Sequence, residues 1–96
     1  MDVSKVGVIG AGQMGNGIAH VMALAGYIVE LDDTKCDALD ASHAIIENNM
    51  LRQVRNGKIS REDQTLALKR IHRSNDIASL SESDLVIEAA TEDETI

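Results

Sequence analysis

The sequence contains no proline, no phenylalanine, no tryptophan and only one tyrosine among its 96 residues. With so few aromatic side chains, the core must be built from Ile, Leu, Val, Ala and Met. The absence of proline, repeats and linker-like stretches gives no sign of a domain boundary, so we expect one small domain. The single cysteine, Cys36, excludes an intrachain disulfide and fits a reducing compartment.

Basic residues are also scarce, with 9 Lys and Arg against 16 Asp and Glu, which gives a formal net charge of −7. This balance argues against nucleic acid or an anionic membrane as a partner, because both are bound through cations that neutralise phosphates. No apolar run approaches the ~20 residues that span a bilayer, and the N-terminus resembles neither a signal nor a transit peptide. We therefore expect a cytoplasmic protein without nucleic-acid or membrane partners, and without a metal site.

Short apolar runs alternate with segments of helical periodicity along the chain. The pattern predicts strands at residues 5–9, 27–31, 71–76 and 85–89, and helices at 14–25, 35–56 and 60–72. The last two helices form a predicted hairpin. Strands and helices that alternate in this way indicate an α/β fold with a parallel sheet and right-handed crossovers.

Some side-chain placements follow from the same patterns. We expect Glu30, which is unusual in an interior strand, to lie on a solvent-exposed part of the sheet, and residues 85–87 to be buried. The predicted apolar stripe of helix 35–56 consists of Leu39, Ile45, Ile46, Met50 and Val54. Ser60 followed by Asp63 resembles a helix N-cap pair.

The stretch VIGAGQMGNGIA places Gly10, Gly12 and Gly15 in the pattern G-x-G-x-x-G, directly after a predicted strand and before a predicted helix. Gly10 permits the tight turn, Gly12 lets a diphosphate approach the backbone, and Gly15 lets the helix pack against the strand. Gly17 is a further expected close-packing position. Because a helix N-terminus attracts anions, the sequence predicts a dinucleotide site here.

A carboxylate about 20 residues after this loop is expected to bind the ribose hydroxyls of the dinucleotide. Asp32 and Asp33 both fit, and spacing alone does not choose between them. Their negative charge would repel a 2′-phosphate, which favours NAD over NADP, whereas Lys35 nearby leaves NADP open. FAD is bound through the same glycine pattern, so the site is better defined than the cofactor.

The runs VIGAGQMGNGIAHVMALAGYIVELDD, IIENNMLRQVRNGKIS and DLVIEAATED together resemble the N-terminal part of 3-hydroxyacyl-CoA dehydrogenases, and bacterial 3-hydroxybutyryl-CoA dehydrogenases most of all. The resemblance implies a Rossmann-type α/β fold with a helical-hairpin insertion and an NAD-dependent interconversion of 3-hydroxyacyl-CoA and 3-ketoacyl-CoA. It also implies that residues 1–96 are an incomplete NAD-binding domain, that a C-terminal helical domain lies outside them, and that the full-length protein is a homodimer.

The resemblance also assigns residues. It makes Asp33 the ribose-binding acid and places Glu92 near the nicotinamide half of the cofactor. It places the catalytic His–Glu pair beyond this segment, so we expect His20, His43 and His72 to have surface or packing roles. The implied phosphate loop consists of Gly10, Ala11, Gly12, Gln13, Met14 and Gly15.

The resemblance also implies that the helical hairpin contributes to the binding site of the acyl-CoA substrate. Arg52, Arg55 and Lys58 are placed to meet CoA phosphates, although a solvated helix end rich in cations explains them equally well. Two other functions stay open. One is a related hydroxy-acid dehydrogenase, and the other is a non-catalytic dinucleotide-binding or crystallin-like structural protein, since fold alone does not determine function.

Overall fold

Four parallel strands form a single sheet in the computed structural model, which describes residues 4–33, 35–74 and 83–89. The strands are β1 (Lys5–Ile9), β2 (Ile28–Asp32), β3 (Ile71–Ser74) and β4 (Leu85–Glu88), arranged in the order β3-β2-β1-β4. Every pairing is parallel, so the carboxyl ends of all four strands lie at one edge. The predicted α/β Rossmann-type sheet is confirmed.

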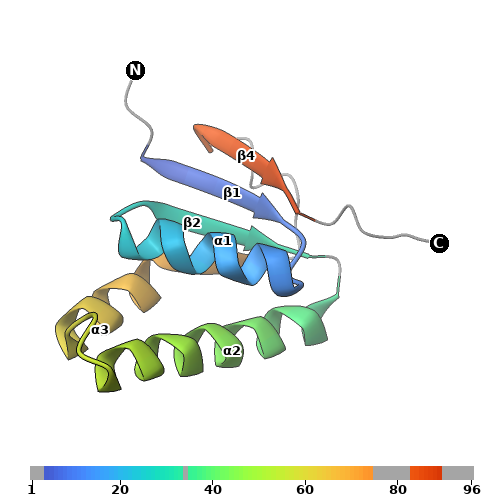
Figure 1. Cartoon of the computed structure of the whole chain (residues 1–96). Helices are drawn as coiled ribbons and strands as arrows, with labels where there is room; N and C mark the ends of the chain where they lie inside the picture. The colour runs from blue at the N-terminus through green and yellow to red at the C-terminus, as the bar shows by residue number, and fades with distance from the viewer. Residues whose placement is uncertain (1–3, 34, 75–82, 90–96) are drawn as a thin grey trace.

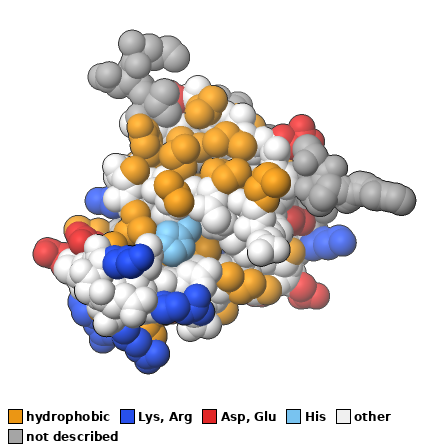
Figure 2. Space-filling model, in the orientation of Figure 1, with side chains coloured by type: hydrophobic (Ala, Val, Ile, Leu, Met, Phe, Trp, Pro, Cys, Tyr) orange, Lys and Arg blue, Asp and Glu red, His pale blue; other side chains and the backbone are white. Residues whose placement is uncertain are grey.

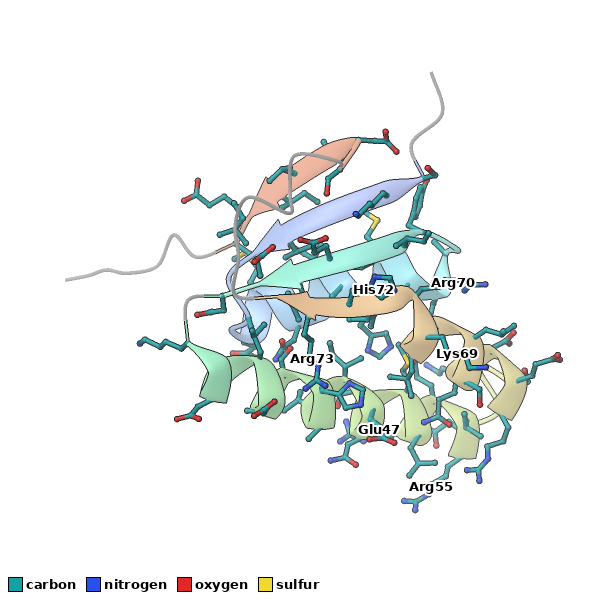
Figure 3. The ribbon with its side chains drawn as sticks, turned by 180° about the vertical axis from the view of Figure 1, so that it is seen from behind. Glu47, Arg55, Lys69, Arg70, His72 and Arg73 are labelled. Atoms are coloured by element: carbon teal, nitrogen blue, oxygen red, sulfur yellow. The ribbon has the colours of Figure 1, made fainter. Side chains whose placement is uncertain are left out.

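Three helices connect these strands and lie on the same side of the sheet (Figures 1 and 3). Helix α1 (Gln13–Leu24) joins β1 to β2, and the hairpin of α2 (Cys36–Arg55) and α3 (Arg61–Arg70) joins β2 to β3. Each lies within one or two residues of its predicted bounds. Among the described residues, no helix is long and apolar enough to cross a membrane.

The turn between α2 and α3 is fixed by the predicted cap. The Ser60 hydroxyl accepts a hydrogen bond from the Asp63 backbone N–H at 3.0 Å, and the Asp63 carboxylate accepts one from the Ser60 N–H at 3.1 Å. This reciprocal capping box satisfies amide groups that the start of α3 would otherwise leave without partners. It sets the point at which the hairpin turns back toward the sheet.

The core is aliphatic, as the composition requires. Strand residues pack against small residues of α1 and against α2, where Leu39, Ile46 and Met50 are buried. Ile45, which the periodicity places in the same stripe, is 47% exposed and lines a surface groove instead. The prediction for Ile45 was wrong because α2 touches its neighbours along a narrower face than the hydrophobic pattern indicates.

Glu30 also departs from its predicted position. It is only 5% exposed, and Lys5 on the neighbouring strand places its Nζ 3.4 Å from Glu30 Oε1. Gly7 lies opposite Glu30 in the β1–β2 register, and Lys5 is two residues away on the same face. The strand tolerates a buried acid because a cation from β1 reaches it.

Strand β4 is more exposed than predicted. Leu85 and Val86 are each 45% exposed, because β4 forms an edge of the described sheet and pairs with β1 there. Asp84 anchors its start: Oδ2 accepts hydrogen bonds from the backbone N–H of Ser4 at 2.9 Å and of Lys5 at 3.0 Å. Both bonds stabilise the ionised carboxylate and so lower the pKa of Asp84, and the bond from Ser4 has the larger effect.

Candidate functional site

The glycine loop joins the carboxyl end of β1 to the start of α1. Gly10 has a φ of 103°, in the left-handed region that favours glycine. Its backbone N–H donates to the carbonyl of Asp32 at the end of β2, at 2.7 Å. The turn is therefore tied to the neighbouring strand, and it directs α1 back along the sheet from the edge where the strands end.

Gly15 brings the helix against this turn. A Cβ at residue 15 would lie 1.8 Å from the carbonyl oxygen of Gly10, so a side chain cannot be accommodated without moving the backbone. The close packing predicted for Gly15 is confirmed. The same prediction for Gly17 was wrong, because a Cβ there would meet nothing within 4 Å.

The start of α1 is shaped to hold an anion. Gly12 is the N-cap residue and no side chain caps this end of the helix, so none covers the first-turn amides. A Cβ on Gly12 would also meet open space, so the approach from outside is unobstructed. Exposed amides at the positive end of a helix dipole suit a diphosphate. The residues present therefore fit the diphosphate of a dinucleotide.

Asp33 lies directly beside this loop. Its Oδ2 accepts a hydrogen bond from the backbone N–H of Ala11 at 2.9 Å, and its Oδ1 accepts one from the N–H of Lys35, also at 2.9 Å. Asp32 is only 3% exposed and belongs to β2. Of the two candidate acids, Asp33 is the one that faces the glycine loop, whereas Glu92 lies outside the described residues.

A groove on the outer side of α1 and α2 continues from the loop in two pockets. The first, of about 480 Å³, is lined by Ala11 and Gly12 of the glycine loop, by the first turns of α1, and by Ile45 and Asn49 of α2. The second, of about 310 Å³, shares Asn49 and is lined by side chains of α1, α2 and the turn that follows. These are His20, Asn49, Arg52, Gln53, Asn56 and Lys58.

The charge changes along this groove. None of the described residues that line the first pocket is charged, whereas Arg52 and Lys58 line the second. Figure 2 shows Lys and Arg side chains gathered at the end of the molecule where α2 meets α3. His20 was expected to have a surface or packing role, and its Nε2 lies 2.7 Å from Gln53 Oε1, which joins α1 to α2 inside the second pocket.

Sequence reasoning missed a buried polar pair between α1 and α2. Ser42 is fully buried, Asn16 is 5% exposed, and the Ser42 hydroxyl donates to Asn16 Oδ1. Helical spacing could have indicated that both residues are buried. Ser42 precedes the buried Ile46 by four residues, and Asn16 precedes the buried Ala19 by three, so both occupy core-facing positions where a polar side chain calls for an explanation.

Comparison with known proteins identifies the family. Residues 5–96 match the family described as 3-hydroxyacyl-CoA dehydrogenase, NAD binding domain. A 3-hydroxybutyryl-CoA dehydrogenase of Bradyrhizobium diazoefficiens is 50% identical over 94 residues, covering 98% of this chain and 32% of the relative. The chain thus spans about one third of the length of that enzyme.

Solved structures agree with the sequence match. The (S)-3-hydroxybutyryl-CoA dehydrogenase of Ralstonia eutropha superposes with a TM-score of 0.92 at 36% identity, covering 97% of this chain and 33% of that one. A lactate dehydrogenase of Cryptosporidium parvum, solved with lactic acid and β-nicotinamide adenine dinucleotide, gives a TM-score of 0.63 at 26% identity, covering all of this chain and 27% of that one.

The family match extends from the first residue of β1 to the end of the sequence and includes the whole glycine loop. Its description names the cofactor that the open helix end and the adjacent acid fit. The chain belongs to the family of NAD-binding domains of 3-hydroxyacyl-CoA dehydrogenases, and its cofactor is NAD.

Proposed function

We propose that the intact protein is an NAD-dependent 3-hydroxyacyl-CoA dehydrogenase that interconverts 3-hydroxybutyryl-CoA and its 3-keto form, with residues 1–96 forming part of its NAD-binding domain. The observation that carries this proposal is the uncapped start of α1 at Gly12, with the Asp33 carboxylate hydrogen-bonded to the same loop at Ala11. The substrate is taken from the names of the Bradyrhizobium diazoefficiens and Ralstonia eutropha relatives, which are both 3-hydroxybutyryl-CoA dehydrogenases.

The loop residues have separate roles in this proposal. The diphosphate lies over Gly12 against the amides of Gln13 and Met14, while Gly10, Ala11 and Gly15 hold the turn that presents them. The Asp33 carboxylate accepts hydrogen bonds from the adenosine ribose hydroxyls. Glu92 is proposed to lie near the nicotinamide end.

NAD, when bound, supplies the hydride acceptor for the oxidation of the substrate hydroxyl. The described residues contribute binding and orientation to this reaction, and we place none of them as the general base. The role of this segment is thus to hold the cofactor in a fixed position at the edge of the sheet where the strands end.

Arg52 and Lys58 support an acyl-CoA as the second ligand. Both line the second pocket, where their charges suit the phosphates at the nucleotide end of CoA. Arg55 does not line that pocket, and Figure 3 shows it projecting away from the sheet. Arg55 fits the alternative reading, a cation near the C-terminal end of the α2 dipole.

The test is oxidation of 3-hydroxybutyryl-CoA by the intact protein, followed as NADH formation with NAD and with NADP. We expect turnover with NAD and much less with NADP, because the Asp33 carboxylate repels a 2′-phosphate. Tight NAD binding without turnover of any 3-hydroxyacyl-CoA would overturn the catalytic proposal and favour a non-catalytic dinucleotide-binding protein.

We also propose that the intact protein is a homodimer, which rests on the family resemblance alone. Light scattering coupled to size-exclusion chromatography of the intact protein gives its mass directly. A mass equal to one chain at working concentration would contradict the proposal. The cytoplasmic location expected from the sequence stays a prediction, which cell fractionation would test.

A further inference from the structure

The first pocket of the α1–α2 groove contains a buried amide whose orientation is fixed. Asn16 is 5% exposed and lines the pocket. Its Oδ1 accepts the hydroxyl hydrogen of Ser42, which is itself fully buried on α2. Because the oxygen is held toward α2, the amide nitrogen has a defined direction as well.

That nitrogen has no acceptor among the described residues: the hydrogen bond from Ser42 to Oδ1 is the one side-chain bond that Asn16 makes there. The nitrogen is not fully enclosed by the protein, so its acceptor can be water or a ligand. Since Asn16 lines the pocket, the acceptor it lacks within the described fold can be supplied by an occupant of the pocket.

The lining of the groove indicates the chemistry of this occupant. The first pocket begins at Ala11 and Gly12, next to the proposed diphosphate position, and extends along α1 toward α2. Beyond the loop it is lined by the carboxamides of Asn16 and Asn49 and by apolar Ile45, with the Gln13 carboxamide at its loop end, and none of the described residues that line it is charged. Carboxamides match the hydrogen-bonding groups of neutral amides. The adjoining pocket shares Asn49 but carries Arg52 and Lys58, which match phosphates. A ligand that follows the groove therefore combines a neutral, amide-bearing chain with an anionic end.

We propose that Asn16 donates a hydrogen bond from Nδ2 to an amide carbonyl of the pantetheine arm of the acyl-CoA substrate, and that Ser42 is the positioning residue that holds Asn16 for this role. The inference rests on the proposed function and adds a specific contact to it. Pantetheine carries two amides, and CoA joins it to a nucleotide with several phosphates. Asn16 thereby binds the neutral pantetheine part of the substrate, while Arg52 and Lys58 bind its phosphates.

Calorimetric titration of the intact protein with CoA, pantetheine, 3′-phosphoadenosine 5′-phosphate and NAD separates these contacts. For Asn16→Ala we expect a three- to tenfold rise in Kd for CoA and pantetheine, roughly the value of one neutral hydrogen bond. The Kd values for 3′-phosphoadenosine 5′-phosphate and NAD should not change. Asn16→Asp, which keeps the acceptor for Ser42 but loses the donor, should weaken the same two ligands and serves if Asn16→Ala does not fold.

Ser42 is tested through its dependence on Asn16. Ser42→Ala should weaken CoA binding less than Asn16→Ala does, and the double variant should bind CoA as Asn16→Ala does, because Ser42 acts through Asn16. A purely structural role for Ser42 would instead give additive losses. Asn48→Ala, which removes an exposed carboxamide beside Asn49 on α2, is the matched control and should leave all four affinities unchanged.

Three results would overturn the inference. CoA affinity unchanged in both folded Asn16 variants would remove the contact while leaving the proposed enzyme intact. If the Asn16 variants lost affinity for NAD but kept their affinity for CoA, Asn16 would be a residue of the dinucleotide site. Absence of CoA binding by the unmodified protein would remove the acyl-CoA substrate as well, which distinguishes failure of the proposed function from failure of the Asn16 contact.

Discussion

The carboxylate of Asp33 makes two backbone hydrogen bonds before any cofactor is considered, one to Ala11 in the glycine loop and one to Lys35 at the start of α2. Each carboxylate oxygen can accept more than one hydrogen bond, so these contacts orient the group without exhausting it. The acid is thus held in place at the loop by the chain that surrounds it.

Replacing Asp33 with Asn should weaken NAD binding by ~1.5–3 kcal/mol, the usual value of a hydrogen bond to a charged group. The loss follows from the charge, since the amide oxygen is a weaker acceptor for ribose hydroxyls. Titration calorimetry with NAD measures it directly. Asp37→Asn, which neutralises an exposed acid in the first turn of α2, is the control, and equal affinities of the two variants would reject Asp33 as the ribose ligand.

Gly15 and Gly17 form a matched pair on one helix. Gly15→Ala should destabilise the protein strongly and weaken NAD binding, because the new Cβ would meet the Gly10 carbonyl oxygen at 1.8 Å. Gly17→Ala meets nothing within 4 Å and should stabilise α1 by up to about 1 kcal/mol through helix propensity. Urea denaturation of both variants checks the contrast, which a similar midpoint for the two would refute.

At the scale of elements, the capping box makes a defined contribution to the α2–α3 hairpin. Ser60→Ala removes the side chain that accepts from the Asp63 N–H and should lower the free energy of unfolding by about 1 kcal/mol. Thr65→Ala, which removes an exposed hydroxyl bonded to the Arg61 carbonyl within the same helix, is the control. Thermal unfolding measures the stability of both variants. A loss of stability in Thr65→Ala equal to or larger than that in Ser60→Ala would contradict the role of the cap.

The attachment of β4 to β1 should depend on acid pH. The backbone hydrogen bonds from Ser4 and Lys5 lower the pKa of Asp84 below its ordinary value of 3.8. A depressed carboxyl pKa contributes stability above the unfolded-state pKa, and this contribution is lost as the pH falls through the lower folded-state pKa. The protection of the Lys5 amide against exchange, measured relative to its intrinsic exchange rate at each pH, should therefore fall below about pH 4.

Asp84→Asn tests that pH dependence. The variant cannot titrate at residue 84, so exchange at Lys5 should be faster at neutral pH and should lack the acid transition. Because Asp84 is exposed, solvent screening keeps the effect modest. If Asp84→Asn showed the same acid transition at Lys5 as the unmodified protein, a group other than Asp84 would be responsible for the transition.

For the molecule as a whole, NAD should raise the thermal stability of the intact protein by mass action. A ligand that binds only the folded state adds about 2.7 kcal/mol at a concentration 100 times its Kd. Thermal scans across a series of NAD concentrations should show a steady rise in Tm, with a smaller rise for NADP at equal concentrations. A Tm that does not respond to NAD would contradict the assignment of this cofactor.

The element order, the strand bounds and the glycine loop were predictable from the sequence because local patterns determine them: apolar runs, helical spacing, and glycines at fixed intervals. The positions of Glu30, Ile45 and Leu85 were not, because burial depends on which neighbour reaches each side chain. Lys5 covers Glu30 from the adjacent strand, and the edge position of β4 leaves Leu85 exposed. The link between Ser42 and Asn16 likewise joins two helices through residues that are 26 positions apart in the chain.

The narrow space between Gly15 and the Gly10 carbonyl also limits how the loop can diversify. Residue 15 admits no substituent, and the left-handed turn at residue 10 disfavours one. Ala11 is buried, whereas Gln13 and Met14 face outward. Proteins built on this loop can therefore exchange outward-facing groups at residues 13 and 14 and so alter what borders the cofactor, while the backbone that grips it keeps the same shape.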